Sequence, residues 1–345
     1  MKKIHWLLFL LLIPGALLAG CSNSPALTVT QAPQTTATLP LAAVTATPAP
    51  SPTAAATKVL FVGAAQDGLQ AALSELSAKS GLTLASLPAL QKSDLTPDVK
   101  VAVLLAPPGD LADLIAAAPQ VQFVVVSTVD LPAAENLTII RTKVENQAFI
   151  AGYISVLLST DFRAAGLLPT DGPLGEGLKE AFVNGGHYFC GVCAPGWPLN
   201  MYYPMVAEQP STADGPTWQA AAASLFDTQK VEVYYLTQAA ARPEVIAYLQ
   251  GRTQADKTLI VLGDATPPDA LKAQWAATVH FDLAAALQQV WPDVVAGKGG
   301  VVQPAKLLVD DVNSDILGPG KMRLVNNLMD QLDADQVLPN TISAQ

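Results

Sequence analysis

Two cysteines, Cys190 and Cys193, have the spacing that most directly indicates chemistry. Outside the cytoplasm such a pair most often forms a structural disulfide, which is our prediction for it. The spacing also fits thiol redox chemistry, but Ala194-Pro195-Gly196 does not continue a helix as thioredoxin-like motifs do. Zinc held together with His187 is a third interpretation, for which a fourth ligand is not apparent in the sequence.

Polar side chains also follow several expected strands. Ligands of open α/β sheets bind beyond the carboxyl ends of the strands. The loops at these ends therefore supply most of the predicted ligand contacts, which are Gln66, Asp67, Asp110, Ser127, Asp130 and Asp264. Their oxygens suit a small ligand rich in hydroxyls or amines. Asp67 and Asp110 each precede an expected helix and are equally suited to capping it.

The segment 187–204 concentrates aromatic side chains in a chain that is only 6% aromatic. Trp197 and Tyr202 could stack on a planar ligand and complete the predicted contacts. The alternative is a long loop whose aromatics form a small core of their own. Three prolines in this segment predict an irregular conformation.

Signatures of known catalytic sites are missing from the sequence. It contains no Gly-x-Ser-x-Gly, no His-Glu-x-x-His and no phosphate loop. The acidic run 310–315 is similar to the start of a calcium-binding loop but lacks its glycine and its final glutamate. We therefore predict no catalytic residue, no metal and no cofactor, and we expect the chain not to be an enzyme.

Composition limits the function classes further. The chain has 345 residues, half of them hydrophobic, and a formal net charge of −10. These values exclude a disordered protein and oppose a nucleic-acid binder, which needs a basic face. The length fits two domains of ordinary size.

The first twenty residues have the pattern of a cleaved signal peptide, with two lysines, an apolar run and small residues before Cys21. Leu18-Ala19-Gly20-Cys21 resembles the bacterial lipobox, which implies cleavage before Cys21 and lipidation of its sulfur. A plain secreted protein with a chance cysteine is the alternative. Residues 22–57, rich in Ala, Thr and Pro and without charges, are expected to be a disordered linker.

From residue 58 onward, apolar strands alternate with helices, which indicates parallel sheets covered on both faces. Strands are expected at 58–63, 82–87, 99–105, 121–127, 137–142, 164–169, 231–236, 258–263, 279–281 and 301–309. Helices are expected at 67–79, 111–118, 145–160, 174–184, 218–228, 243–250 and 283–295. The fold class is therefore α/β, with two doubly wound parallel-sheet lobes.

Four segments resemble the basic membrane protein family of substrate-binding lipoproteins, which have the type I periplasmic-binding fold. One of them, the helix and glycine-rich turn at 283–300, is similar to the family's return to the first lobe. Residues 145–155 are similar to the family's Glu-x-x-(Tyr/Phe)-Leu-Ala-Gly helix, in which Gly152 would permit close packing. Ala181-Phe182 and Gly185 resemble its Gly-Phe-x-x-Gly ending, and Leu262-Gly263-Asp264 resembles its Gly-Val-Asp strand end. The resemblance implies that Asp264 holds a ribose. The family's first loop, Asp-x-Ser-Phe-Asn, is replaced here by residues 64–68 without an aromatic.

The resemblance implies a first lobe of residues 58–160 plus about 282–345 and a second lobe of 161–281. It implies a monomeric solute receptor, anchored outside the cytoplasm to the bacterial cell membrane, that passes a small ligand, for example a nucleoside, to an ABC permease. The alternative is a surface lipoprotein of the same fold that acts as a sensor subunit or structural adaptor. An extracytoplasmic oxidoreductase using Cys190 and Cys193 is a third interpretation.

Overall fold

The computed structural model describes residues 57–63, 67–171, 177–196, 201–255 and 259–340. The expected signal peptide, Cys21 and the linker lie outside these residues and stay predictions. Among the helices of the described residues, none is long and apolar enough to cross a membrane.

The first lobe is built on sheet A, whose six strands are all parallel and run in the order β11-β5-β4-β3-β1-β2. Its strands are β1 (Lys58–Val62), β2 (Thr83–Leu87), β3 (Val99–Leu104), β4 (Gln122–Ser127), β5 (Leu137–Arg141) and β11 (Val302–Pro304). Its helices are α1 (Asp67–Lys79), α2 (Leu111–Ala117) and α7 (Leu283–Val295), with a short 3-10 helix at Lys92–Asp94.

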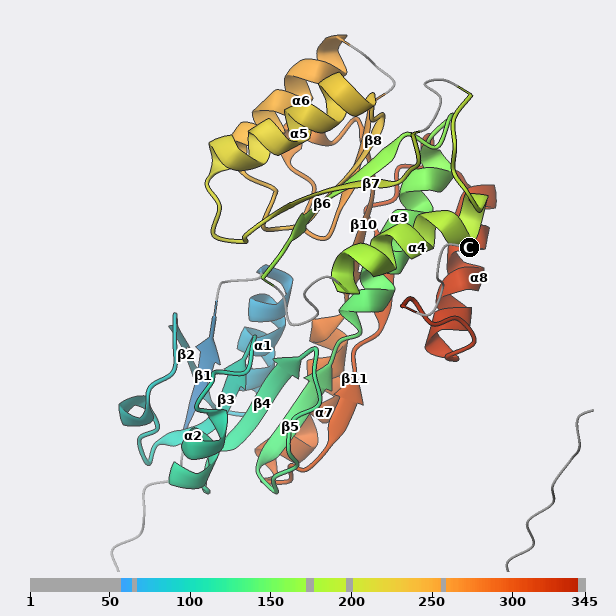
Figure 1. The fold of residues 1–345 in the computed structure, drawn as a ribbon. Helices are drawn as coiled ribbons and strands as arrows, with labels where there is room; N and C mark the ends of the chain where they lie inside the picture. Colours follow the sequence, from blue (N-terminus) through green and yellow to red (C-terminus); the bar gives the residue numbers. More distant parts are fainter. Residues whose placement is uncertain (1–56, 64–66, 172–176, 197–200, 256–258, 341–345) are drawn as a thin grey trace, which may run out of the picture. The chain divides into compact units, whose positions relative to one another are not determined.

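Both faces of sheet A are covered, because successive residues of each strand point to opposite sides. Val59 and Phe61 of β1 pack with α1 and α7, whereas Leu60 and Val62 belong to the core that contains α2. Figure 1 shows this lobe with the blue-to-green strands β1–β5 beside the orange β11. This arrangement accounts for the nearly continuous apolar runs in the strands.

The second lobe is built on sheet B, with strand order β12-β10-β9-β8-β6-β7. Its strands are β6 (Ala164–Pro169), β7 (Met205–Gln209), β8 (Val233–Leu236), β9 (Ile260–Gly263), β10 (Trp275–Phe281) and β12 (Leu307–Asp310). Only the edge strand β12 is antiparallel to its neighbour. Its helices are α3 (Val144–Leu158), α4 (Gly177–Cys190), α5 (Gly215–Gln229), α6 (Pro243–Ala255) and α8 (Pro319–Asp333), with a short 3-10 helix at Asp269–Leu271.

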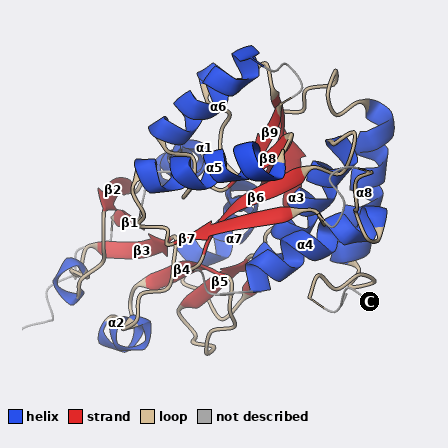
Figure 2. Ribbon diagram, turned by 45° about the horizontal axis from the view of Figure 1, so that its top comes forward, coloured by secondary structure: helices blue, strands red, loops and turns tan. Residues whose placement is uncertain are grey.

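Helices cover sheet B in two groups. In Figure 2, α3, α4 and α8 lie together, and α5 lies beside α6. One cluster of buried side chains joins these helices to the sheet, and α3 contributes most of its length to it. The prediction of an α/β chain with two lobes on parallel sheets is therefore confirmed.

The sheets divide the chain differently from the boundaries we expected. Helix α3 packs in the core of sheet B although it lies before residue 161. Strand β12 and helix α8, beyond residue 282, also belong to the second lobe. The apolar pattern of a helix shows that it is buried but does not show which sheet buries it.

The expected single strand at 301–309 is wrong. Val302–Pro304 pairs with β5 in sheet A, and Leu307–Asp310 pairs with β10 in sheet B. The chain changes sheets at residues 305 and 306. Apolar residues stand on both sides of this change, at Val302 and at 307–309, because both halves lie in sheets.

The segment 187–204 is also more regular than its prolines indicated. Helix α4 continues through Cys190 and ends where Gly191 takes a φ of +71°. All three prolines lie after this point, so none of them interrupts the helix. The edge strand β7, which we did not predict, follows the segment.

Two glycines allow α3 and α4 to cross at very short range. A Cβ atom on Gly152 would overlap the backbone carbonyl of Phe182, and one on Gly185 would overlap that of Phe149. The contact is reciprocal, so each helix presents its glycine to the backbone of the other. This packing agrees with the role we expected for Gly152.

Gly152→Ala and Gly185→Ala should each destabilise the fold by about 1–3 kcal/mol, the usual cost of overpacking, because the new methyl group meets backbone rather than a movable side chain. Gly251, within α6, has open space around it. Gly251→Ala should therefore be neutral or stabilise the chain by about 0.5–1 kcal/mol. Urea unfolding measures all three, and equal stabilities would contradict the close crossing.

Candidate functional site

The carboxyl ends of the parallel strands form one edge in each sheet. The strand order reverses beside β1 in sheet A and beside β6 in sheet B, and ligands of α/β sheets bind at such reversals. The loops after β1 and β6 fall partly outside the described residues. Those after β4, β5, β8 and β9 are described and can be compared with the prediction.

Asp264 is the first residue after β9, at the carboxyl edge of sheet B. Its carboxylate accepts a hydrogen bond from the backbone N–H of Gln238, which follows β8. The residue is half-buried, and Oδ1 is covered from solvent without a hydrogen-bond partner. A covered oxygen that lacks a donor costs free energy, which a ligand hydroxyl or amine would recover.

Burial has the largest effect on the pKa of this carboxyl group. It raises the pKa of Asp264 to about 7, and the Gln238 hydrogen bond and the charge of His280 offset only part of this effect. His280 is itself engaged, with Nε2 2.9 Å from Oδ2 of Asp310. The folded chain therefore holds Asp264 near the balance between its neutral and ionised forms at physiological pH.

Two predicted contacts of the first lobe, Ser127 and Asp130, are less available to a ligand than Asp264. The hydroxyl of Ser127 is buried and tied to Val129, since it donates to the carbonyl oxygen at 2.7 Å and accepts from the N–H at 3.2 Å. Asp130 is almost fully exposed, and its Oδ1 lies 3.6 Å from Nε of Arg141. Ser127 is thus already satisfied within its own turn.

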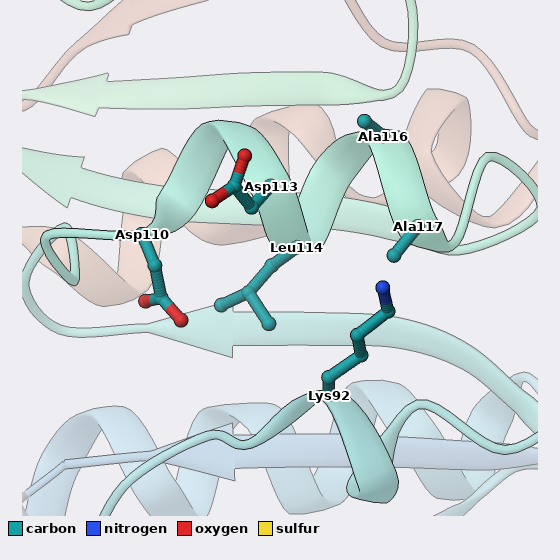
Figure 3. Close-up of a pocket in the computed structure, with 6 residues that line it drawn as sticks. All are labelled: Lys92, Asp110, Asp113, Leu114, Ala116 and Ala117. Atoms are coloured by element: carbon teal, nitrogen blue, oxygen red, sulfur yellow. The ribbon is translucent and has the colours of Figure 1, made fainter.

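Asp110 begins α2 without making a side-chain capping bond. It lines a surface pocket together with Lys92, Asp113, Leu114, Ala116 and Ala117. Figure 3 shows Asp110 at the start of α2 and Lys92 reaching toward its end. The pocket runs along the helix, and Asp110 is the one predicted ligand contact among its lining residues.

Of the remaining predicted contacts, the structure describes only the side chain of Tyr202. Tyr202 is exposed and lies just before β7, at the amino edge of sheet B, opposite the edge that holds Asp264. Gln66 and Trp197 lie outside the described residues. Asp67 begins α1, and its side chain is outside the description.

The aromatic residues of the α4 end pack on α3. Tyr188 meets the ring of Phe149 edge-on at 5.7 Å between centroids, and Phe189 meets Tyr153 at 5.5 Å. These contacts fit the interpretation of a local aromatic core rather than a stacking platform for a ligand.

Cys190 and Cys193 are joined as a disulfide at the end of α4. Nε2 of His187 lies 3.1 Å from the carbonyl oxygen of Tyr203. Among the described residues, no group of three or more His, Cys, Asp or Glu side chains is placed to hold a metal ion. With the sulfurs bonded to each other, they are not thiolate ligands in this structure.

Sequence reasoning missed two groups at the carboxyl edges, Arg141 and the backbone N–H of Gln238. Arg141 ends β5 and could have been found by the rule that selected the loops, because it is the last residue of its strand. The Gln238 donor has no sequence signal, since any residue type supplies a backbone N–H.

The stability of the chain should depend on pH through Asp264. The folded state keeps the proton up to about pH 7, whereas the unfolded chain releases it near pH 4. Compared with Asp264→Asn, the wild type should lose up to about 4 kcal/mol of its free energy of unfolding as the pH rises from about 4 to about 7. Above about pH 7 the difference should stay constant. Urea unfolding across this range measures the difference.

Asp269 supplies the control. It is exposed, and its hydrogen bond with Lys272 lowers its pKa. Asp269→Asn should therefore show no such fall between pH 4 and 7. If the difference in free energy of unfolding between the wild type and Asp264→Asn also stays constant across this pH range, the carboxyl group of Asp264 has an ordinary pKa.

Comparison with known proteins finds solved structures with a similar fold. No protein-family model and no curated protein sequence matches the chain. A solute-binding protein of an ABC transporter system from Aeropyrum pernix K1 superposes with a TM-score of 0.64 at 12% identity, covering 82% of this chain and 92% of that one. A second, from Conexibacter woesei DSM 14684, has a TM-score of 0.59 at 15% identity, with coverages of 84% and 100%.

A third structure, the Caulobacter myo-inositol binding protein bound to myo-inositol, has a TM-score of 0.52 at 16% identity, covering 80% of this chain and all of that one. At such identities the likeness concerns the fold alone. The chain, with its two α/β lobes on parallel sheets, therefore has the type I periplasmic-binding-protein fold.

Proposed function

We propose that this protein is a membrane-anchored, extracytoplasmic solute-binding protein that delivers a small ligand to an ABC transporter. The observation that carries the proposal is Asp264, a covered carboxyl group with a free oxygen at the carboxyl edge of sheet B. Solute-binding proteins of ABC transporter systems share the fold. In this proposal the chain acts as a monomer, and Cys21 carries the lipid anchor.

The ligand class follows from the chemistry of Asp264. An ionised or neutral carboxyl group accepts hydrogen bonds from hydroxyl and amine groups. The resemblance to the basic membrane protein family favours a nucleoside, and the myo-inositol complex of a protein with this fold supports a polyhydroxylated ligand. Both classes present adjacent hydroxyls, so they are compared directly in the experiment below.

Function would depend on closure of the two lobes over the ligand. A ligand shifts an open–closed equilibrium only if it binds the closed state more tightly, so it must contact both sheet edges. The chain passes between the lobes at residues 142–143, at Asp282 and at 305–306. These short crossings are suited to absorb a change in angle between two rigid lobes.

A sensor subunit or structural adaptor is the second candidate function. It is favoured by Ser127, whose hydroxyl is used within its own turn and leaves the edge of sheet A with fewer free polar groups. An adaptor needs no tight small-molecule ligand, so binding experiments separate the two candidates.

The test is a thermal-shift screen of the full-length protein in detergent with nucleosides, myo-inositol, hexoses and amino acids. A ligand at 100 times its Kd should stabilise the native state by about 2.7 kcal/mol. The shift should disappear in Asp264→Asn and persist in Asp269→Asn, which changes an exposed carboxylate of the same lobe.

A shift that survives in Asp264→Asn would place the ligand elsewhere. The absence of a shift with every class would reject the solute-binding proposal in favour of the adaptor.

A further inference from the structure

Arg141 occupies the carboxyl edge of sheet A, where the chain leaves the first lobe. It is the last residue of β5, a strand held between β4 and β11. Its carbonyl oxygen accepts from the N–H of Ala305, 2.8 Å away on the third crossing. The backbone of Arg141 is thus fixed by a neighbouring strand and by another crossing.

The guanidinium group of Arg141 is largely buried, but its hydrogen bonds are incomplete. Its side chain is only 24% exposed. The single acidic neighbour in ion-pair range among the described residues is Asp130, which is almost fully exposed and 3.6 Å away, beyond hydrogen-bond distance. Nη1 is covered from solvent and has no acceptor among the described residues.

Two other charged side chains, Lys143 and Glu145, lie near the first crossing. Lys143 donates to Oδ1 of Asp335 at 2.7 Å and is therefore paired. Glu145, in the first turn of α3, keeps Oε2 covered and without a donor. One free donor and one free acceptor thus flank the first crossing, although a guanidinium and a carboxylate normally pair when they can.

We infer that Arg141 binds an oxyanion of the ligand, a carboxylate or a phosphate. This inference rests on the proposed function, in which one ligand contacts the carboxyl edges of both sheets. The planar guanidinium presents parallel N–H donors that match the oxygens of such a group. The ligand is then an acid that also carries hydroxyl or amine donors, because Asp264 and Glu145 both offer acceptors.

The nearby negative charges do not oppose this assignment. Asp130 is solvated, so its field is weakened by water and salt. Glu145 gains a partner from a hydroxyl or amine next to the oxyanion. A neutral ligand of the same shape offers Nη1 only an uncharged hydroxyl or carbonyl oxygen, and a hydrogen bond to such an oxygen is weaker than one to a charged oxygen. The arrangement therefore selects acids over their neutral counterparts.

Calorimetry with three matched pairs tests the inference on the full-length protein. The pairs are glucuronate and glucose, glutamate and glutamine, and adenosine monophosphate and adenosine. The acid of at least one pair should bind ten times or more tighter than its neutral partner, as expected for one charge-assisted bond. The first two pairs probe carboxylates, and the third probes phosphate.

Three variants separate recognition from a structural role. Arg141→Gln should abolish the preference for the acid, and Arg141→Lys should restore part of it. Arg323→Gln, on the exposed surface of α8, makes the same charge change and should leave the preference intact. A Tm of Arg141→Gln without ligand close to that of the wild type would show that the variant is folded.

Equal binding of acid and neutral partners, or a preference that survives in Arg141→Gln, would overturn the inference and leave the proposed function standing. Failure of every acid and every neutral compound to bind would overturn both.

Discussion

The three crossings of the chain between its lobes constrain the rest of the structure. The first follows the carboxyl end of β5, the second follows that of β10, and the third follows that of β11. Hydrogen bonds link them, from Ala305 N–H to the Arg141 carbonyl and from Asp282 N–H to the Lys306 carbonyl. Every crossing thus begins at a carboxyl edge, where parallel sheets present ligand-binding groups. The connections between the lobes and the candidate site therefore lie at the same edges of the sheets.

The polar groups at these edges differ in how far their hydrogen bonds are completed. Asp264 and Arg141 each keep a covered polar atom without a partner, whereas Ser127 completes its hydrogen bonds within a turn. A buried group that lacks a partner lowers stability, and the raised pKa of Asp264 expresses the same cost. Such local costs are typical of functional sites, which the packing elsewhere must offset. The reciprocal contacts of Gly152 and Gly185, which lock α3 against α4, supply part of that packing.

Several features of the fold could be predicted because they depend on short-range patterns. The predicted bounds of the helices at 67–79 and 283–295 and of the strand at 164–169 agree with those in the structure. The position of Asp264 after an apolar strand predicts that it lies at the carboxyl edge of a sheet, and it lies there with an unsatisfied oxygen. The prediction for Tyr202 rests on its chemistry alone, and this residue lies at the opposite edge of the sheet.

The sequence by itself determined the α/β class and the alternation of strands and helices, because strand and helix periods are local properties. Only the tertiary structure decided which sheet each segment joins. Residues 301–309 read as one strand but divide between two sheets, and α3 packs on the second lobe rather than the first. Pairing partners and burial of single atoms, such as Nη1 of Arg141, depend on residues far apart in the chain, so no local pattern encodes them.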